Sequence, residues 1–221
     1  MAETTFERPW HGAEVAGSPA LDLTNTLDWR LRQEPVELLS TFGELLRWAR
    51  SHGILGPAEA RTLRAWGAEH PRAAERKLVE TRDLREVIAA AAAALSRGEG
   101  APPRVLARLE EAGRRASSAR RLRPEGTGAV WDWKSVDADR PALGAALDAI
   151  RLLSSPERDK VRQCADAECG RFFLDTSRNA SRRWCSMKAC GNRNKARRHV
   201  RRRREARAET AGADRSRSAR G

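Results

Sequence analysis

Four cysteines in the last third of the chain carry the clearest chemical signal. Four residues separate the members of each close pair, fifteen residues separate the two pairs, and the cysteines are Cys164, Cys169, Cys185 and Cys190. Thiolates are preferred zinc ligands, and two close pairs joined by a short arm can enclose one tetrahedral ion. The spacing therefore predicts a structural site in which four sulfur atoms hold one Zn²⁺.

Other uses of these cysteines fit the pattern less well. A thioredoxin-like dithiol has two residues between its cysteines and a βαβ context, and a catalytic zinc normally keeps an open position beside three protein ligands. His199 could replace a cysteine, but it follows Cys190 by nine residues. On a helix that spacing corresponds to roughly 13 Å. Four sulfur ligands remain the favoured set.

The residues between and after the pairs indicate how the module folds. Arg171–Asp175 follows Gly170 and is predicted to be a strand, and Arg182–Cys185 is predicted to return beside it after a polar turn. Ser186 can cap a helix that carries Cys190 in its first turns. This order predicts a small α+β module that resembles a treble clef. Its apolar core would come from Phe172, Phe173 and Trp184.

The charge of the chain is concentrated at one end. The net charge is +13, and residues 156–221 hold 20 Lys and Arg against 8 Asp and Glu. The first 155 residues hold 23 against 22. Such an asymmetry favours a polyanionic partner, either nucleic acid or an anionic membrane surface.

The basic residues are densest on the helix predicted after the last cysteine. Nine of the fifteen residues from 193 to 207 are Arg or Lys, and Glu205 is the one acidic residue among them. We expect nucleic-acid contacts from Arg193, Lys195, Arg197, Arg198, Arg201, Arg202 and Arg204. Arg193 and Arg197, being closest to the zinc fold, are the best candidates for reading bases. The alternative is a solvated basic tail. Arg171, Arg182, Arg183 and Lys188 would also offset the formal charge of −2 on a zinc with four thiolates.

The front of the chain is predicted to be mostly helical. Apolar periodicity, together with Pro at helix starts and Gly at helix ends, marks six segments. We expect helices over 21–30, 41–52, 72–97 and 141–153. Another is expected to begin at Pro57 and stop before His70-Pro71, and another to follow Pro103 and end near Gly113 or Ser117. Alternation around Trp131 and Trp133 beyond a Gly-rich turn predicts a short hairpin within 122–134.

The same region offers little evidence of catalysis. It holds no Gly-rich phosphate loop, no pair of metal-binding histidines and no nucleophile motif. His11, His52 and His70 are isolated, and the tryptophans at 29, 48 and 66 are expected in the core rather than along a pocket wall. If a small-molecule effector binds, we expect it near Asp22, Asn25 and Trp29.

No membrane segment is expected. Met1–His11 lacks the basic start and apolar run of a signal peptide. The longest apolar run, Val87–Leu95, has nine residues, whereas a membrane span needs roughly 20. A cytoplasmic location is expected, and clustered cysteines in a reducing compartment favour zinc over disulfides.

Two motifs resemble known families. Trp184–Met187 followed by Cys190-Gly191-Asn192-Arg193 resembles the CGNR zinc finger, and Cys164 with Cys169 matches the first pair of that finger. Leu21–Leu27 resembles the opening motif of the helical ABATE domain, which precedes this finger in its family. Together the resemblances cover roughly residues 17–205. They imply a role in stress-induced transcription regulation.

These observations define a working interpretation. Residues 17–155 are expected to form a helical sensor or association domain, 156–207 the zinc finger with its basic helix, and 208–221 a disordered tail. The function that fits best is a DNA-binding transcription regulator. An RNA-binding or ribosome-associated zinc protein is the main alternative, because charge alone does not separate DNA from RNA. An enzyme is the least supported class, and the sequence leaves the oligomeric state open.

Overall fold

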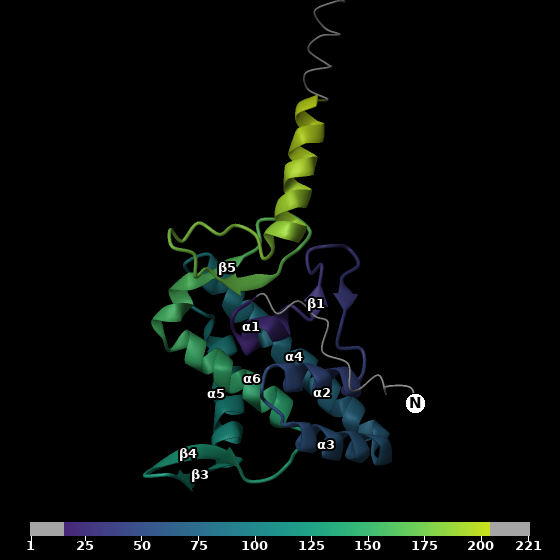
Figure 1. Cartoon of the computed structure of the whole chain (residues 1–221), viewed down its shortest axis with the longest axis vertical. Coiled ribbons are helices and arrows are strands. Elements are labelled where there is room, and N and C mark those ends of the chain that lie inside the picture. The colour runs from purple at the N-terminus through teal and green to yellow at the C-terminus, as the bar shows by residue number, and fades with distance from the viewer. Residues whose placement is uncertain (1–15, 204–221) are drawn as a thin grey trace, which may run out of the picture. The chain divides into compact units, whose positions relative to one another are not determined.

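The computed structural model of the protein describes residues 16–203 (Figure 1). It divides into two compact units, of which the first extends through Cys185 and the second begins at Ser186. The expected tail over 208–221 lies outside the described residues. The limits expected for independently folding domains, 17–155 and 156–207, remain a prediction.

Five of the six expected helices form close to their predicted positions. They are α2 (Phe42–Ser51), α3 (Pro57–Glu69), α4 (Pro71–Ser96), α5 (Pro103–Ser118) and α6 (Arg140–Leu153). Proline occupies the first turn of the last four, where its missing N–H costs no hydrogen bond. Thr41 and Glu44 form a capping box at the start of α2.

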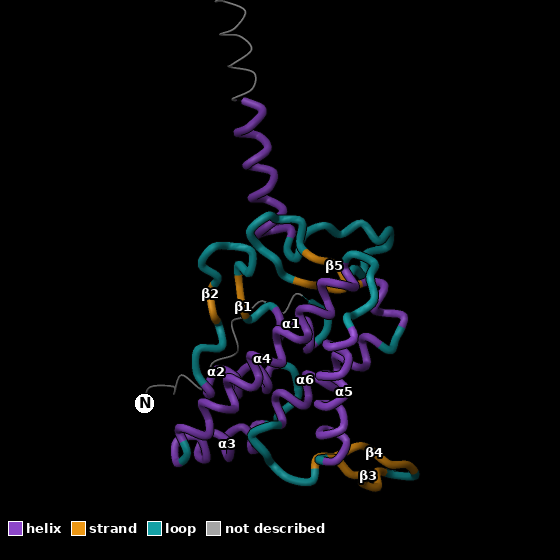
Figure 2. Tube along the Cα trace, turned by 180° about the vertical axis from the view of Figure 1, so that it is seen from behind, coloured by secondary structure: helices purple, strands orange, loops and turns teal. Residues whose placement is uncertain are grey.

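α4 is central to the helical packing. It contacts α1, α2, α3, α5 and α6, among which it runs in Figure 2. Its buried face carries Leu78 and Ile88. Trp48 is fully buried in the same cluster, and Trp66 packs against it while partly buried. The expectation that these two tryptophans belong to the core is confirmed.

The first helix is shorter than predicted. α1 covers Pro19–Thr24, where a helix over 21–30 was expected. Leu27–Asp28 instead forms β1, which pairs antiparallel with β2 (Val36–Glu37), and Trp29 has a positive φ of 53°. A residue in that conformation cannot continue a right-handed helix. Tertiary pairing has therefore overridden the helical pattern after Thr24.

Among residues 16–185, three separate two-stranded antiparallel sheets accompany the helices. Besides β1–β2, they are β3 (Arg120–Glu125) with β4 (Gly128–Trp133), and β5 (Val161–Gln163) with β6 (Phe172–Leu174). The β3–β4 hairpin confirms the prediction for 122–134. A 3₁₀ turn, η1 (Pro156–Lys160), links α6 to β5.

The partner of β6 differs from the prediction. β6 pairs with Val161–Gln163, whereas Arg182–Cys185 was expected to supply the second strand. Residues 175–185 form turns and loops, and one backbone hydrogen bond from Ala165 N–H to the Arg183 carbonyl joins them to the first cysteine segment. Because the hairpin is built from residues on both sides of the first cysteine pair, the return strand is not needed.

The zinc module also lacks the separate core that we expected. Phe172, Leu174 and Val161 belong to a buried cluster with Ala89 and Leu152 of the helical region. Phe173 is buried under the Arg182 guanidinium, which lies 4.2 Å from the ring centroid, whereas Trp184 is only half-buried. The strands of the module are therefore stabilised by the helices, in addition to any metal.

The second unit begins with the predicted cap. The Ser186 hydroxyl accepts a hydrogen bond from Ala189 N–H and precedes η2 (Met187–Gly191), a single π-helical turn that contains Cys190. The helix then continues as α-helix over 192–203. The predicted position of Cys190 in the first turn is confirmed.

Asn25 provides a test of how the helical region holds β6. Its Nδ2 donates to the Phe172 carbonyl and its Oδ1 accepts from the Phe172 N–H, both at 2.9 Å. Asn25→Ala would leave two buried backbone groups without partners, so the free energy of unfolding should fall by about 1–3 kcal/mol. Urea unfolding of the zinc-loaded chain measures this. The exposed Asn179→Ala is the control, and an equal effect of both substitutions would contradict the assigned role.

Candidate metal centre and nucleic-acid interface

The four cysteines meet at one buried point. Their Sγ atoms all lie within 4.8 Å of one another, and none forms a disulfide. The Sγ atoms of Cys169 and Cys185 are 3.6 Å apart. A tetrahedral zinc with bonds near 2.3 Å separates its sulfur ligands by about 3.8 Å. The donor set, its size and its burial fit Zn²⁺, and exposed His199 is not part of the group.

Short elements position the first pair. Cys164 directly follows β5, and its N–H donates to the Arg171 carbonyl at 2.8 Å. Cys169 precedes Gly170, which has a φ of +70° just before β6. A Cβ at Gly170 would lie 2.9 Å from Leu31 Cγ, so both conformation and space require glycine here. The two cysteines thus flank a tight knuckle at the end of the β5–β6 hairpin.

The thiols cannot ionise independently. Hydrogen bonds from the Cys169 and Cys185 thiols lower the pKa of Cys164 to about 2, because they stabilise its thiolate. Hydrogen bonding to Cys164 raises the pKa of Cys169 to about 12 and also raises the pKa of Cys185. The sulfurs therefore need a cation among them before all can be thiolates, which is the charge that Zn²⁺ supplies.

Two cationic side chains lie close to the sulfur atoms, Arg171 from the expected set and Arg193. Burial opposes the charge on Arg171, but a hydrogen bond to Asp28, the Asp28 charge and the nearby Cys185 and Cys169 raise its pKa. The Arg193 Nη2 lies 3.4 Å from Cys190 Sγ. Arg182 donates to the carbonyl oxygens of Trp184 and Cys185 and so shapes the loop before the third ligand. Arg183 and Lys188 are exposed.

A segment that sequence reasoning did not connect with zinc holds the knuckle in place. Besides the Asn25–Phe172 contact, Asp28 Oδ1 accepts from Arg171 Nε at 3.0 Å. Arg30 N–H donates to the Cys169 carbonyl at 3.1 Å. Arg32 Nε donates to Glu168 Oε2 at 2.8 Å. We call residues 25–32 the clamp segment.

The residues proposed for an effector site have separate environments. Asp22 accepts from the Ala16 N–H and lies 3.5 Å from His52 Nε2, both side chains being buried. Both functional groups of the Asn25 amide bind the Phe172 backbone. Trp29 lies under Arg32, 3.6 Å from the ring centroid. An effector site at these residues remains a prediction, and no local sequence pattern indicated the contact of Asn25 with β6.

The helix after Cys190 is strongly basic along its described length. Residues 192–203 contain seven Arg and Lys and no acidic residue. Arg193 is half-buried, whereas Lys195, Arg197, Arg198, Arg201 and Arg202 are exposed. Arg204, also predicted to contact nucleic acid, lies outside the described residues. Helical spacing places 193, 197 and 201 in one row and 195, 198 and 202 in a neighbouring row.

The fold and the site define a helical domain followed by a four-cysteine zinc finger. Comparison with known families agrees: residues 17–156 match ABATE, described as "Putative stress-induced transcription regulator", and residues 160–203 match the CGNR zinc finger. The chain belongs to the ABATE family, since that match covers more than half of it. No curated protein matches the chain. Among residues 16–203, no helix has the length and apolar character required to span a membrane.

Zinc content and local stability test the site. Native mass spectrometry should find one Zn²⁺ per chain, because the four thiols form one group. After chelation or Cys190→Ser, hydrogen exchange should accelerate in residues 186–191, where the turn contributes the last ligand. The β5–β6 strands should keep more protection, since Val161 and Phe172 pack among helical residues.

The matched control is Ser181→Ala, an exposed change in the same module. It should leave both zinc content and exchange unchanged. A chain that binds no zinc, or whose 186–191 turn is equally protected with and without metal, would contradict the assignment.

Proposed function

We propose that the protein is a DNA-binding transcription regulator whose zinc finger presents the basic helix to duplex DNA. The observation that carries the proposal is the run of seven cationic residues on 192–203, which continues directly from the turn holding Cys190. Zinc ligation at Cys190 fixes the start of this helix, so its first side chains have defined positions. Nucleic-acid phosphates would neutralise the charge that otherwise opposes helix formation.

The helix dimensions and side chains suit the major groove. B-DNA accepts an α-helix there, and arginine binds guanine O6 and N7 through two hydrogen bonds. Two neighbouring rows of cations could contact phosphates on both sides of the groove. Because Arg193 already approaches Cys190 Sγ, Arg197 is the better placed of the two candidates for reading a base. Lys195, Arg198, Arg201, Arg202 and Arg204 would bind phosphates.

The helical region would regulate the finger, by sensing an effector or by mediating association, and would have no catalytic role. The clamp segment gives a route for such regulation, because residues 25–32 follow α1 and bind both β6 and the Cys169 knuckle. An effector near Asp22, Asn25 and Trp29 would act on these contacts. A groove of about 700 Å³ between α5 and α6, lined by Leu106, Leu147 and Ile150, is a second place for an apolar effector. We place this activity in the cytoplasm.

RNA is the alternative partner. Trp184 is half-exposed beside Arg183, whose guanidinium lies 5.4 Å from the ring centroid. An aromatic ring next to a cation can stack on an unpaired base, which duplex DNA does not offer. If RNA is the partner, Trp184→Ala should weaken binding to single-stranded RNA and leave duplex DNA binding unchanged.

The salt dependence of binding tests the helix directly. Each phosphate neutralised on B-DNA contributes about 0.9 to the slope of log affinity against log salt. Changing Arg201, Arg202 and Arg203 to alanine should weaken binding to all duplex sequences and reduce the slope by up to about three phosphates' worth. Fluorescence anisotropy of a labelled duplex at several salt concentrations measures both quantities.

A control variant that loses the same charge elsewhere in the chain shows whether binding depends on the helix itself or only on net charge. Arg61, Arg72 and Arg104 are exposed residues of α3, α4 and α5, and their replacement by alanine also removes three positive charges. The control variant should keep nearly the same slope of log affinity against log salt as the parent chain. If both variants behave alike, or if neither differs from the parent chain, the helix is not the binding element.

A further inference from the structure

The β3–β4 hairpin forms a sheet of its own that no other described strand extends. It follows α5, which β3 contacts, and Arg140 of α6 lies over the Trp133 ring of β4, 5.3 Å from its centroid. Both views place the hairpin at the end of the first unit opposite β5 (Figures 1 and 2). An isolated two-stranded sheet is marginally stable in water, and it is stabilised by packing against a helix or by further strands with an apolar face. The hairpin is therefore suited to acquiring further strands.

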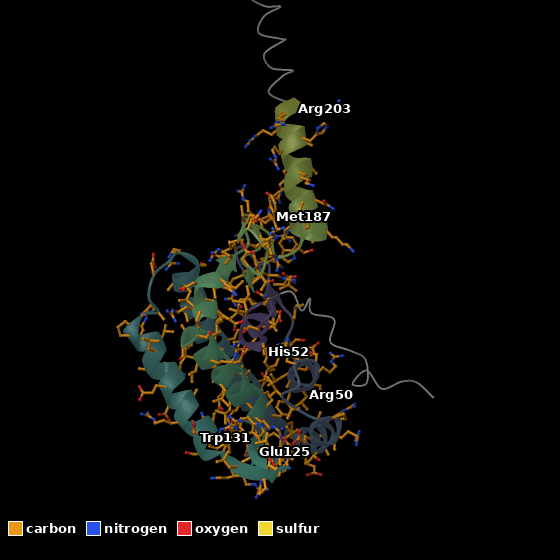
Figure 3. All side chains as sticks on the ribbon, turned by 60° about the vertical axis from the view of Figure 1, so that its left-hand side comes forward. Arg50, His52, Glu125, Trp131, Met187 and Arg203 are labelled. Carbon is orange, nitrogen blue, oxygen red and sulfur yellow. The ribbon has the colours of Figure 1, made fainter. Side chains whose placement is uncertain are left out.

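One face of this hairpin exposes apolar side chains beside Arg120, whose guanidinium lies 5.1 Å from the Trp131 ring centroid. Leu122 pairs with Trp131 across the strands, and the two are 60% and 54% exposed. Pro124 and Ala129 form the next pair on the same face, and both are exposed. Figure 3 shows Trp131 on the hairpin, far from His52. Large apolar side chains gathered on an exposed surface commonly mark an interface.

The backbone pattern identifies which edge is open. The Lys134 N–H donates to the Ala119 carbonyl, and antiparallel pairing alternates from there, so Asp132 and Val130 direct their backbone groups toward β3. Ala129 and Trp131 therefore direct theirs outward from β4. The Trp133 N–H also points outward, and it is already bonded to Asp132 Oδ1 at 2.9 Å.

The two edges are not equivalent. The outward positions of β3 are Arg120, Leu122 and Pro124. Arg120 carries a charge, and proline has no N–H to offer a new strand. Proline on an edge is a common means of blocking strand addition. β4 has neither proline nor a charged side chain at Ala129 or Trp131, so it is the edge that can accept a strand.

We propose that β4 pairs antiparallel with β4 of a second copy of the chain, making a continuous four-stranded sheet. The edge is self-complementary. The twofold axis passes between the Val130 residues of the two copies. In each copy the backbone N–H and C=O of Ala129 then form hydrogen bonds with the C=O and N–H of Trp131 in the other copy. In this register the outward N–H and C=O groups of Ala129 and Trp131 are all hydrogen-bonded. The pairing stops at Trp133, because its N–H is already bonded to Asp132 Oδ1. Such isologous pairing closes as a dimer and does not propagate into a fibre.

Side chains on both faces favour this register. On the apolar face, the row across the dimer runs from Leu122 and Trp131 of one copy to Ala129 and Pro124 of the other, which joins the two exposed patches. On the other face Val130 meets Val130, and each Arg123 stays near Asp132 of its own chain, with Nε and Oδ2 3.5 Å apart. No like charges become direct neighbours.

The dimer supplies the association role considered under the proposed function, but it does not depend on DNA binding. A twofold protein matches two half-sites of a palindromic DNA site. A monomeric chain that binds DNA would overturn the dimer and leave the proposed function standing. A dimeric chain that binds no nucleic acid would overturn the proposed function and leave the dimer standing.

Sedimentation velocity of the zinc-loaded full chain over a wide range of concentration tests the proposal. The parent chain should reach twice 24.6 kDa. Ala129→Pro removes an outward N–H that β3 does not use, and Trp131→Glu places a charge in the interface, so both should sediment as monomers. Pro124→Ala, on the opposite edge, should remain dimeric. A parent chain that stays monomeric, or a dimer unaffected by both β4 variants, overturns the proposal.

If the β4 variants fail to fold, cross-linking tests the proposed β4 interface instead. Across the proposed axis the two Val130 residues form a non-hydrogen-bonded pair, whose Cα atoms would be about 4.5 Å apart. That separation lies within disulfide range. Val130→Cys should therefore give a disulfide-linked dimer under mild oxidation of the zinc-loaded chain, whereas Leu122→Cys on β3 should not. Equal cross-linking of both variants, or of neither, overturns the β4 interface.

Discussion

Four thiols buried within 4.8 Å of one another can all be ionised only if a cation lies among them. That constraint determines much of the local structure. The strands that flank the first pair have three residues each, too few to fix a knuckle alone. Glycine at 170, the Arg182 contacts with the loop carbonyls and the π turn at Cys190 all serve to bring sulfur atoms to one point. Zinc then joins these short elements, as folding and metal binding are coupled in such modules.

The helical region contributes to the same site through the clamp segment. Hydrogen bonds and ion pairs from Asn25, Asp28, Arg30 and Arg32 reach the residues from 168 to 172. Phe172 and Leu174 also lie in a cluster with Ala89 and Leu152. The zinc knuckle is thus held on one side by metal ligation and on the other by the packing of the helices. A change in the position of α1 has a direct physical route to the metal site.

The parts that could be predicted from sequence depend on local signals. Proline in the first turn marks α3 and α6, and the cysteine spacing alone indicates a four-sulfur site. The missed parts depend on contacts between distant residues. Asn25 and Phe172 are 147 positions apart, so no local pattern shows that the amide of one binds the backbone of the other. For the same reason the end of α1 and the strand that pairs with β6 could not be inferred from periodicity.

The basic helix follows the turn that carries Cys190 without interruption. If the metal positions that helix for DNA, zinc and affinity must be linked. The most direct measurement compares duplex DNA binding by the full chain with zinc, after chelation and after zinc is restored, at one fixed salt concentration. The account predicts that affinity falls on chelation and recovers with zinc. Equal affinity in all three states would show that the basic residues bind as a charged tail, independent of the zinc fold.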